Sequence, residues 1–268
     1  MNVSRMPPRE PTITSKVPQV TVAFWIIKLL ATTVGETGGD AVSMTLDLGY
    51  AVASLIYVAF FAVALTVQVG SRRYRPLAYW AVVVATTTVG TTLSDYLDRT
   101  VGLGYVKSSI ILLMGVLVLL LVWRRVAGRI VFEKITSRRD EIFYWLTILV
   151  SNTLGTALGD FVATDAGLGF GHGTLVFGGL LAMVAAGHRF IPVVPASAYF
   201  WAAYVLSRPF GATLGDLLTK PRDEGGLALG RIVASLVILA AMLLGILLVS
   251  RHDRKRAAAT IASSRSTA

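Results

Sequence analysis

A sixteen-residue pattern that begins with Trp and ends with Asp occurs four times in this chain. In every copy a Gly lies ten residues after the Trp, a small residue lies fourteen after it, and the Asp lies fifteen after it. The copies occupy residues 25–40, 80–95, 145–160 and 201–216, so successive Trp residues are 55, 65 and 56 positions apart. Self-similarity at such intervals predicts four copies of one supersecondary unit. The longer middle interval predicts two halves of two units each.

The composition is that of a membrane protein. Of the 268 residues 54% are hydrophobic and only 15% are charged, whereas about a quarter of the residues in a soluble domain are charged. Eight apolar stretches approach the ~20 residues that cross a bilayer core, which is too long for barrel strands. They lie near residues 20–38, 48–70, 77–95, 102–123, 142–160, 167–187, 195–216 and 228–250. We therefore predict an all-α integral membrane protein with eight transmembrane helices.

Each repeat is predicted to be a helical hairpin whose second helix opens with the dipeptide Leu-Gly. Four such hairpins have the same orientation and form two pseudo-symmetric halves. The repeats lie at about 20–70, 77–123, 142–187 and 195–250, within a membrane domain of residues 20–250. We expect residues 1–19 to be a cytoplasmic tail without a cleaved signal peptide, 124–141 a solvated connection, and 251–268 a disordered cytoplasmic tail.

The distribution of basic residues predicts the orientation. A net charge of +10 on a soluble protein suggests nucleic acid as a partner. With both termini inside, however, 18 of the 25 Lys and Arg residues lie in inner segments, five lie at outer ends and two lie within spans. Cytoplasmic loops of membrane proteins carry this excess. We therefore expect a multi-pass protein of the bacterial inner membrane with both termini cytoplasmic, a lipid bilayer as its surroundings and no nucleic acid partner.

A polar face runs along the first helix of each repeat. Positions 3, 7, 11 and 15 after the Trp are spaced i, i+4 and share one helix face. In chain order they are Lys28, Thr32, Glu36 and Asp40; Val83, Thr87, Thr91 and Asp95; Ile148, Asn152, Thr156 and Asp160; Tyr204, Arg208, Ala212 and Asp216. Such a face is costly in lipid and points to the bundle interior or to water. The sequence therefore predicts a central polar cavity that is open, or can open, to the outside.

The residue types on this face suit hard cations and protons. Carboxylate, hydroxyl and amide oxygens are ligands for Mg²⁺, Ca²⁺ or Mn²⁺, and the five acids against two bases give the face a formal charge of −3. The candidate cation or proton ligands are Glu36, Asp40, Asp95, Asp160, Asp216, Thr32, Thr87, Thr91, Asn152 and Thr156, with Glu36 and Asp40 first as metal ligands. We expect Lys28 and Arg208 to act as counter-charges, and Lys107 and His172 to lie at the entrance.

Structural roles remain open for the same residues. The Gly pairs form small-xxx-small motifs that favour close helix packing, the Asp residues could cap loops, and the Trp residues could anchor the helices at the membrane interface. Glu36 and Lys28 lie eight residues apart, roughly 12 Å along a helix, so a direct pair within the helix is not expected.

The sequence resembles a bacterial family of poorly characterised integral membrane proteins built from four tandem two-helix repeats, each with a Trp. The stretches KVPQVTVAFWIIKLLATTVGETGGD and RPFGATLGDLLTKPRDEGGLALG carry the resemblance most clearly, and it covers roughly residues 17–250. It implies the fold and the membrane location but no biochemical role.

The residues therefore have to indicate the function. They favour a secondary transporter for a hard divalent metal cation, coupled to protons. The alternatives are a transporter of a small anionic solute bound by Lys28 and Arg208, a scaffold or sensor that transports nothing, and an intramembrane enzyme. The chain has no Cys, no phosphate-binding loop and no nucleophile motif, so we expect neither an enzyme nor a cofactor.

Overall fold

The computed structural model describes residues 17–71, 74–128, 130, 135 and 137–266, which form eight α-helices and no strand. The helices are α1 (Val22–Asp40), α2 (Gly49–Gly70), α3 (Pro76–Asp95), α4 (Tyr105–Ala127), α5 (Arg138–Asp160), α6 (Gly169–Phe190), α7 (Ala196–Thr219) and α8 (Arg231–Ser266). One π-helical turn extends each of α1, α3 and α5: η1 (Ala41–Thr45), η2 (Tyr96–Thr100) and η3 (Phe161–Asp165). Each predicted apolar stretch corresponds to one helix.

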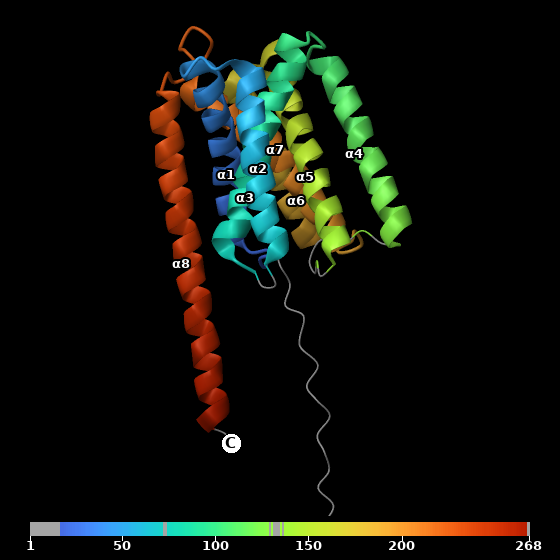
Figure 1. Ribbon diagram of the computed structural model, residues 1–268, viewed down its shortest axis with the longest axis vertical. Coiled ribbons are helices and arrows are strands. Elements are labelled where there is room, and N and C mark those ends of the chain that lie inside the picture. The colour runs from blue at the N-terminus through green and yellow to red at the C-terminus, as the bar shows by residue number, and fades with distance from the viewer. Residues whose placement is uncertain (1–16, 72–73, 129, 131–134, 136, 267–268) are drawn as a thin grey trace, which may run out of the picture.

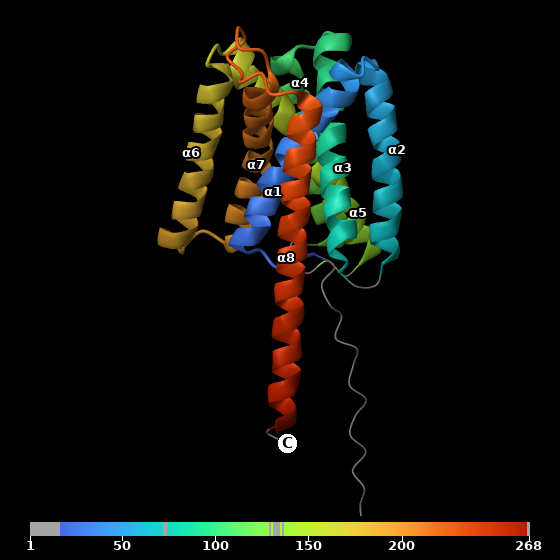
Figure 2. The same ribbon diagram turned by 90° about the vertical axis from the view of Figure 1, so that its left-hand side faces the viewer.

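The four odd-numbered helices form a closed inner ring. Helix α1 packs against α3 and α7, and α5 packs against the same two helices from the other side. The even-numbered helices lie outside the ring (Figures 1 and 2). All four odd helices run in the same direction, so the ring has a Trp end, where they begin, and an Asp end, where the repeated Asp residues lie. The Asp end is at the top of Figure 1.

The two helices of one repeat do not form the main packing pair. Helix α2 packs on α3, α4 on α5, α6 on α7, and α8 on α1, so each even helix covers the odd helix of the next repeat. The two helices of each predicted hairpin are therefore consecutive in the chain, but the second helix packs mainly on the first helix of the next repeat. Contacts of α2 with its own repeat are concentrated in η1.

The Leu-Gly dipeptides mark the point where the chain turns into the outer helices. Gly49, Gly104 and Gly169 have φ angles of 69°, 72° and 71°, a left-handed conformation that is costly for residues with a Cβ atom. Because the conformation recurs at the same place in three repeats, Gly is needed there for the backbone.

The outer surface and the inner ring differ in polarity as a membrane protein requires. Six of the helices, all except α1 and α7, are long and apolar enough to cross a membrane by length and composition. Large apolar side chains such as Leu55, Leu175 and Val233 are exposed on the outer helices, where lipid would cover them. Helices α1 and α7 instead carry Lys28, Glu36 and Arg208 in the interior. The predicted all-α, multi-pass architecture is confirmed.

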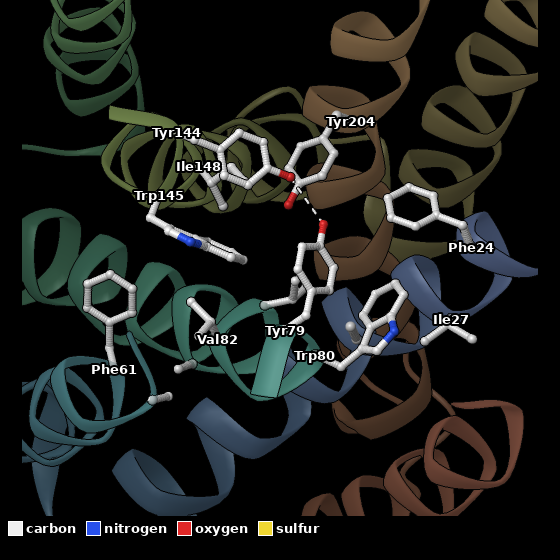
Figure 3. Close-up of a cluster of buried hydrophobic side chains, with 14 of the residues drawn as sticks. Phe24, Ile27, Phe61, Tyr79, Trp80, Val82, Tyr144, Trp145, Ile148 and Tyr204 are labelled. Atoms are coloured by element: carbon white, nitrogen blue, oxygen red, sulfur yellow. Dashed lines mark hydrogen bonds between the residues drawn. The ribbon is translucent and has the colours of Figure 1, made fainter. Parts of the chain in front are cut away.

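Aromatic contacts close the ring at the Trp end. The residue before each Trp is also aromatic, and its ring lies against the Trp of the next repeat. The pairs are Phe24 with Trp80, Tyr79 with Trp145, Tyr144 with Trp201 and Phe200 with Trp25, with ring centroids 5.5, 5.4, 6.1 and 5.8 Å apart. Figure 3 shows part of this cluster. Trp80 and Trp145 are buried, so the expected role as interfacial anchors is wrong for these two residues.

Glycines allow the inner helices to approach closely. A Cβ added at the Gly ten residues after each Trp would meet the residue seven after the Trp of the next repeat. These pairs are Gly35 with Thr87, Gly90 with Asn152, Gly155 with Arg208 and Gly211 with Thr32. The expected packing role of the glycines is therefore confirmed, and the contact is repeated all the way around the ring.

The ends of the chain differ in part from expectation. Helix α8 continues through Ser266 and projects beyond the Trp end (Figure 2), where the sequence predicts a disordered tail from residue 251. The sequence there includes an Ala run at 257–259, and Ala has the highest helix propensity. Residues 1–16 of the predicted N-terminal tail lie outside the described residues, as do residues 129, 131–134 and 136 of the predicted connection 124–141. That connection is shorter than expected, because α4 continues through Ala127 and α5 begins at Arg138.

Replacing Gly35 should therefore destabilise the ring. In Gly35→Ala the new Cβ would overlap the side chain of Thr87 and approach its backbone carbonyl carbon to 3.1 Å, so α1 and α3 must move apart. We expect a fall of several degrees in the unfolding temperature of the detergent-solubilised protein. Gly179→Ala is the matched control, because Gly179 lies inside α6 with no atom near the added Cβ. Equal unfolding temperatures for the two variants would contradict the packing role.

Candidate functional site

The polar faces of the four inner helices meet along the axis of the ring. All sixteen residues at positions 3, 7, 11 and 15 after each Trp are at most 3% exposed, which confirms that these faces point inward. The sequence predicts a cavity between them, but near the middle of the ring the Arg208 side chain reaches across to three other helices. The candidate site is a network of ion pairs and hydrogen bonds at two levels, one in the middle of the ring and one at its Asp end.

Arg208 connects all four repeats at the middle level. Its Nη2 atom lies 2.8 Å from Glu36 Oε2, 2.6 Å from Thr91 Oγ1 and 2.7 Å from Thr156 Oγ1, so its two N–H groups are shared among these three acceptors. These acceptors stand eleven residues after the Trp in the first three repeats, where the fourth repeat has Ala212. Thr91 also donates to Glu36 at 3.2 Å. Arg208 is fully buried, and its predicted role as a counter-charge fits its contact with Glu36.

Two basic residues occupy the Asp end, and each contacts two of the repeated Asp residues. Lys220 Nζ lies 3.0 Å from Asp40 Oδ2 and 3.2 Å from Asp216 Oδ1. In the other half of the ring, Arg99 Nε lies 3.0 Å from Asp95 Oδ1, and Arg99 Nη2 lies 4.0 Å from Asp160 Oδ2. Each base follows the Asp of its own repeat by four residues and reaches the Asp of the next repeat.

These contacts give the ring twofold character. Arg99 joins the second repeat to the third, and Lys220 joins the fourth to the first, so both bases hold the two halves of the chain together. At the equivalent position the first and third repeats have Met44 and Thr164. Arg231, at the start of α8, adds a further contact to Asp40, with its Nε atom 3.5 Å from Oδ2.

The bases at the Asp end change the predicted charge of the site. The polar faces alone carry a formal charge of −3, but Arg99, Lys220 and Arg231 add three positive charges, so five acids face five bases. Sequence reasoning assigned these three residues only to the outer ends of helices. The spacing of four residues in Asp95–Arg99 and Asp216–Lys220 is the signal that could have identified two of them.

Lys220 is held in its charged form by its neighbours. Burial lowers the pKa of this lysine, but the carboxylates of Asp216 and Asp40 outweigh that effect and leave its pKa raised. The ammonium group is therefore a permanent cation between two carboxylates.

Three carboxyl groups converge where Lys220 lies. Oxygen atoms of Glu36, Asp40 and Asp216 all fall within 4.8 Å of one another, and all three residues are buried. Two of them come from α1 and one from α7, the pair of helices that joins the first repeat to the last. An arrangement of this size can hold a hard cation with oxygen ligands.

The remaining predicted ligands are buried, and their side chains form hydrogen bonds to other groups of the protein. Thr32 donates to backbone carbonyls of its own helix, and Thr87 donates to Ala31 O across to α1 at 3.1 Å. Asn152 Nδ2 donates to Thr86 Oγ1 at 3.0 Å. The hydrogen bonds of Thr87 and Asn152 thus join neighbouring inner helices, whereas those of Thr32 stay within α1.

The two other basic candidates and the histidine have different surroundings. Lys28 is fully buried, and its Nζ lies 4.3 Å from the centre of the Tyr204 ring. Lys107 and His172 are exposed at the starts of α4 and α6 and lie outside the central network, with His172 Nδ1 3.1 Å from Leu168 O. The structure therefore brings the acids, Arg208 and Lys28 together in the ring but not the two expected entrance residues.

Comparison with known proteins identifies the repeats. The family described as "Repeat of Unknown Function (DUF347)" matches residues 23–74, 78–129, 143–191 and 199–255. Each match begins near the start of an odd helix, and the first three extend just beyond the end of the following even helix, whereas the fourth ends within α8. Each match thus corresponds to one sequence hairpin. No curated protein and no solved structure matches the chain.

The contact between Arg208 and Glu36 predicts a specific pattern of stability changes. Arg208→Met should lower the free energy of unfolding by about 3–5 kcal/mol, because it leaves a buried carboxylate without its partner. The double variant Arg208→Met, Glu36→Gln should recover part of this loss. Thermal unfolding in detergent measures both, with Arg189→Met at an exposed position as the control. If the stability losses of the single variants Arg208→Met and Glu36→Gln add up to the loss in the double variant, the two side chains are not coupled.

Proposed function

Because the chain belongs to the DUF347 repeat family, whose description assigns no activity, we propose its function from the geometry of the ring. The protein is a secondary transporter that moves a hard divalent metal cation across the membrane in exchange for protons. Glu36, Asp40 and Asp216 bind the cation, and Arg208 and Lys220 are internal cations that balance these acids when the cation is absent.

The position of Lys220 carries this proposal. Its ammonium group lies within 3.2 Å of both Asp40 and Asp216, among the same carboxylates that can bind a metal ion. A lysine ammonium is a compact charge on a flexible stem, so it can leave when another cation arrives. The acids therefore have a cationic partner in both states, and neither state leaves them uncompensated in the interior.

Exchange of Lys220 for a cation also supplies a conformational step. Lys220 joins the first repeat to the last, across one of the two seams between the halves of the ring. When the cation takes the place of the Lys220 ammonium, the contact between Lys220 and Asp40 is lost at the Asp end. The four aromatic pairs still hold the inner helices together at the Trp end. Movement of one half against the other around a central site is a common route to alternating access.

Arg208 plays the corresponding part deeper in the ring. It contacts Glu36, which also belongs to the carboxylate cluster. A cation bound to Glu36 weakens the ion pair between Glu36 and Arg208. Arg208 then competes for the same carboxylate and favours release of the cation, so that binding remains reversible.

The orientation proposed from the basic residues places the Trp end at the cytoplasm of a bacterial cell, with both termini on that side. The chain has no Cys, so single cysteines can test this in cells. Arg189→Cys, at the Trp end, should react with a membrane-impermeant maleimide only after the cells are opened, whereas Asp223→Cys, in the α7–α8 loop, should react in intact cells. The reverse pattern would contradict the orientation.

The transport proposal predicts the behaviour of acid variants in proteoliposomes. With Mn²⁺, Mg²⁺ and Ca²⁺ offered in turn, wild-type protein should take up at least one of them, and a pH gradient should change the rate. Glu36→Gln and Asp40→Asn should each reduce this uptake at least tenfold. Asp47→Asn is the control, because Asp47 is exposed in the α1–α2 loop.

Other outcomes of this assay identify the alternatives. Normal uptake in both acid variants would refute the proposed site. If metal uptake is absent and an organic anion is taken up only when Lys28 and Arg208 are intact, the protein transports an anionic solute. Three buried donors at these residues, Lys28 Nζ, Arg208 Nε and Arg208 Nη1, have no hydrogen-bond partner among the described residues, which favours that reading as the second candidate.

A further inference from the structure

Lys28 is the one basic residue of the polar faces whose charge the network does not balance. It is fully buried, and within the described part of the chain its Nζ has neither a hydrogen-bond acceptor nor an ion-pair partner. Its Nζ lies over the face of the Tyr204 ring, 4.3 Å from the ring centroid. Arg208, one turn above Tyr204 on α7, repels its charge. An ammonium group in such a place has lost its hydration and gained only a cation–π contact.

The charged groups around Lys28 can be followed helix by helix, because α1 packs against α7, α3 and α8. Tyr204 and Arg208 of α7 face it directly, and Glu36 of its own helix lies two turns away and is engaged by Arg208. The other ionisable groups on α1, α3, α7 and residues 231–250 of α8 are Asp40, Tyr79, Asp95, Tyr199, Asp216 and Arg231, and Arg251, His252 and Asp253 follow on α8 beyond its apolar part. The segment 232–250 of α8 has no ionisable residue.

The charges of the whole site divide into two unequal levels. At the Asp end four acids face Arg99, Lys220 and Arg231, which leaves a formal charge of −1. In the middle level Glu36 faces Arg208 and Lys28, which leaves +1. The site is neutral as a whole, so a cation that binds at the Asp end leaves it with excess positive charge. If Lys28 loses its proton, that excess falls by one unit.

Tyrosine hydroxyl groups lie on the Trp side of Lys28. Tyr204 lies under the lysine, and the hydroxyl groups of Tyr204, Tyr144 and Tyr79 point toward one another (Figure 3). Tyr79 Oη and Tyr144 Oη are 3.1 Å apart, a hydrogen bond in which either can donate. A tyrosine hydroxyl both donates and accepts. The residues at the equivalent level of the second and third repeats, Val83 and Ile148, are apolar. Lys28 Nζ and Tyr204 Oη have no hydrogen-bond partner among the described residues, so passage of a proton along the tyrosines requires these two side chains to move together.

On these observations we propose that Lys28 is the proton-carrying group of the transporter. This inference rests on the cation exchange proposed above and assigns its coupling step to one residue. When a cation enters from the Trp end and binds among Glu36, Asp40 and Asp216, the Lys28 ammonium becomes a neutral amine and gives one proton to the aqueous phase at that end by way of the tyrosine hydroxyls. When the cation leaves to the Asp end, the amine takes one proton from that side, so one proton crosses the membrane against the cation.

The test measures cation binding and proton movement separately in purified full-length protein. Mn²⁺ binding is followed by electron paramagnetic resonance in detergent, and proton movement by a pH-sensitive dye inside proteoliposomes to which Mn²⁺, Mg²⁺ or Ca²⁺ is added. Wild-type protein should bind the ion and move protons. Lys28→Met should retain Mn²⁺ binding within about threefold and lose at least nine-tenths of the proton movement. Lys255→Met, at an exposed position on α8, should match wild type.

A second variant covers a failure of Lys28→Met to fold. Lys28→Arg keeps a permanent positive charge, so it should bind Mn²⁺ more weakly than wild type and move no protons. If either variant binds Mn²⁺ and moves protons as wild type does, Lys28 does not carry the proton, and the proposed cation transport still stands. If wild-type protein binds none of the three ions, both proposals fail. If proton movement follows a chloride gradient and is independent of the metal ion, the site binds an anion and the Lys28 proposal is overturned.

Discussion

Close approach of the four inner helices is the constraint on which the rest of the structure depends. Each inner helix offers a Gly to the residue seven after the Trp of the next repeat, as Gly35 does to Thr87. In a membrane, helices associate through packing and polar contacts rather than through burial of apolar surface from water. Small residues at these positions therefore determine how near the polar faces can come, and only at that short distance can Arg208 of one repeat reach acceptors on the other three.

The ring is fourfold in its packing and only twofold, or lower, in its chemistry. Glycines and aromatic pairs recur in every repeat, because each seam needs the same close contact. The charged residues do not recur in the same way. Arg99 and Lys220 appear in alternate repeats, whereas Lys28, Glu36 and Arg208 each occur once. A repeated framework with unequal polar residues produces one asymmetric site, and the acids that could bind a metal are concentrated at the α1–α7 seam.

Much of this architecture follows from local patterns in the sequence. The apolar stretches predict the helices, the i, i+4 spacing predicts the buried polar faces, and the Gly spacing predicts close packing. The pairing of each outer helix with the next repeat is not local, because the sequence of α2 is equally compatible with packing on α1 or on α3. The partners of the acids were missed for the same reason. Lys220 lies close to Asp216 in sequence, but it meets Asp40 only because the first and last repeats adjoin, and Arg208 reaches Glu36 across 172 residues of chain.

The displaced packing of the outer helices has a consequence for how the chain is made. Helix α1 is synthesised first, yet the helix that covers its outer side, α8, is synthesised last. Asp40 meets Lys220 and Arg231, and Glu36 meets Arg208, only after the fourth repeat has been translated. During biosynthesis the helix whose polar face has the most charged residues is thus in the membrane before the residues that neutralise its acids. A chain that stops after the third repeat lacks Arg208, Lys220 and Arg231, so Glu36 and Asp40 are left without these three ion-pair partners.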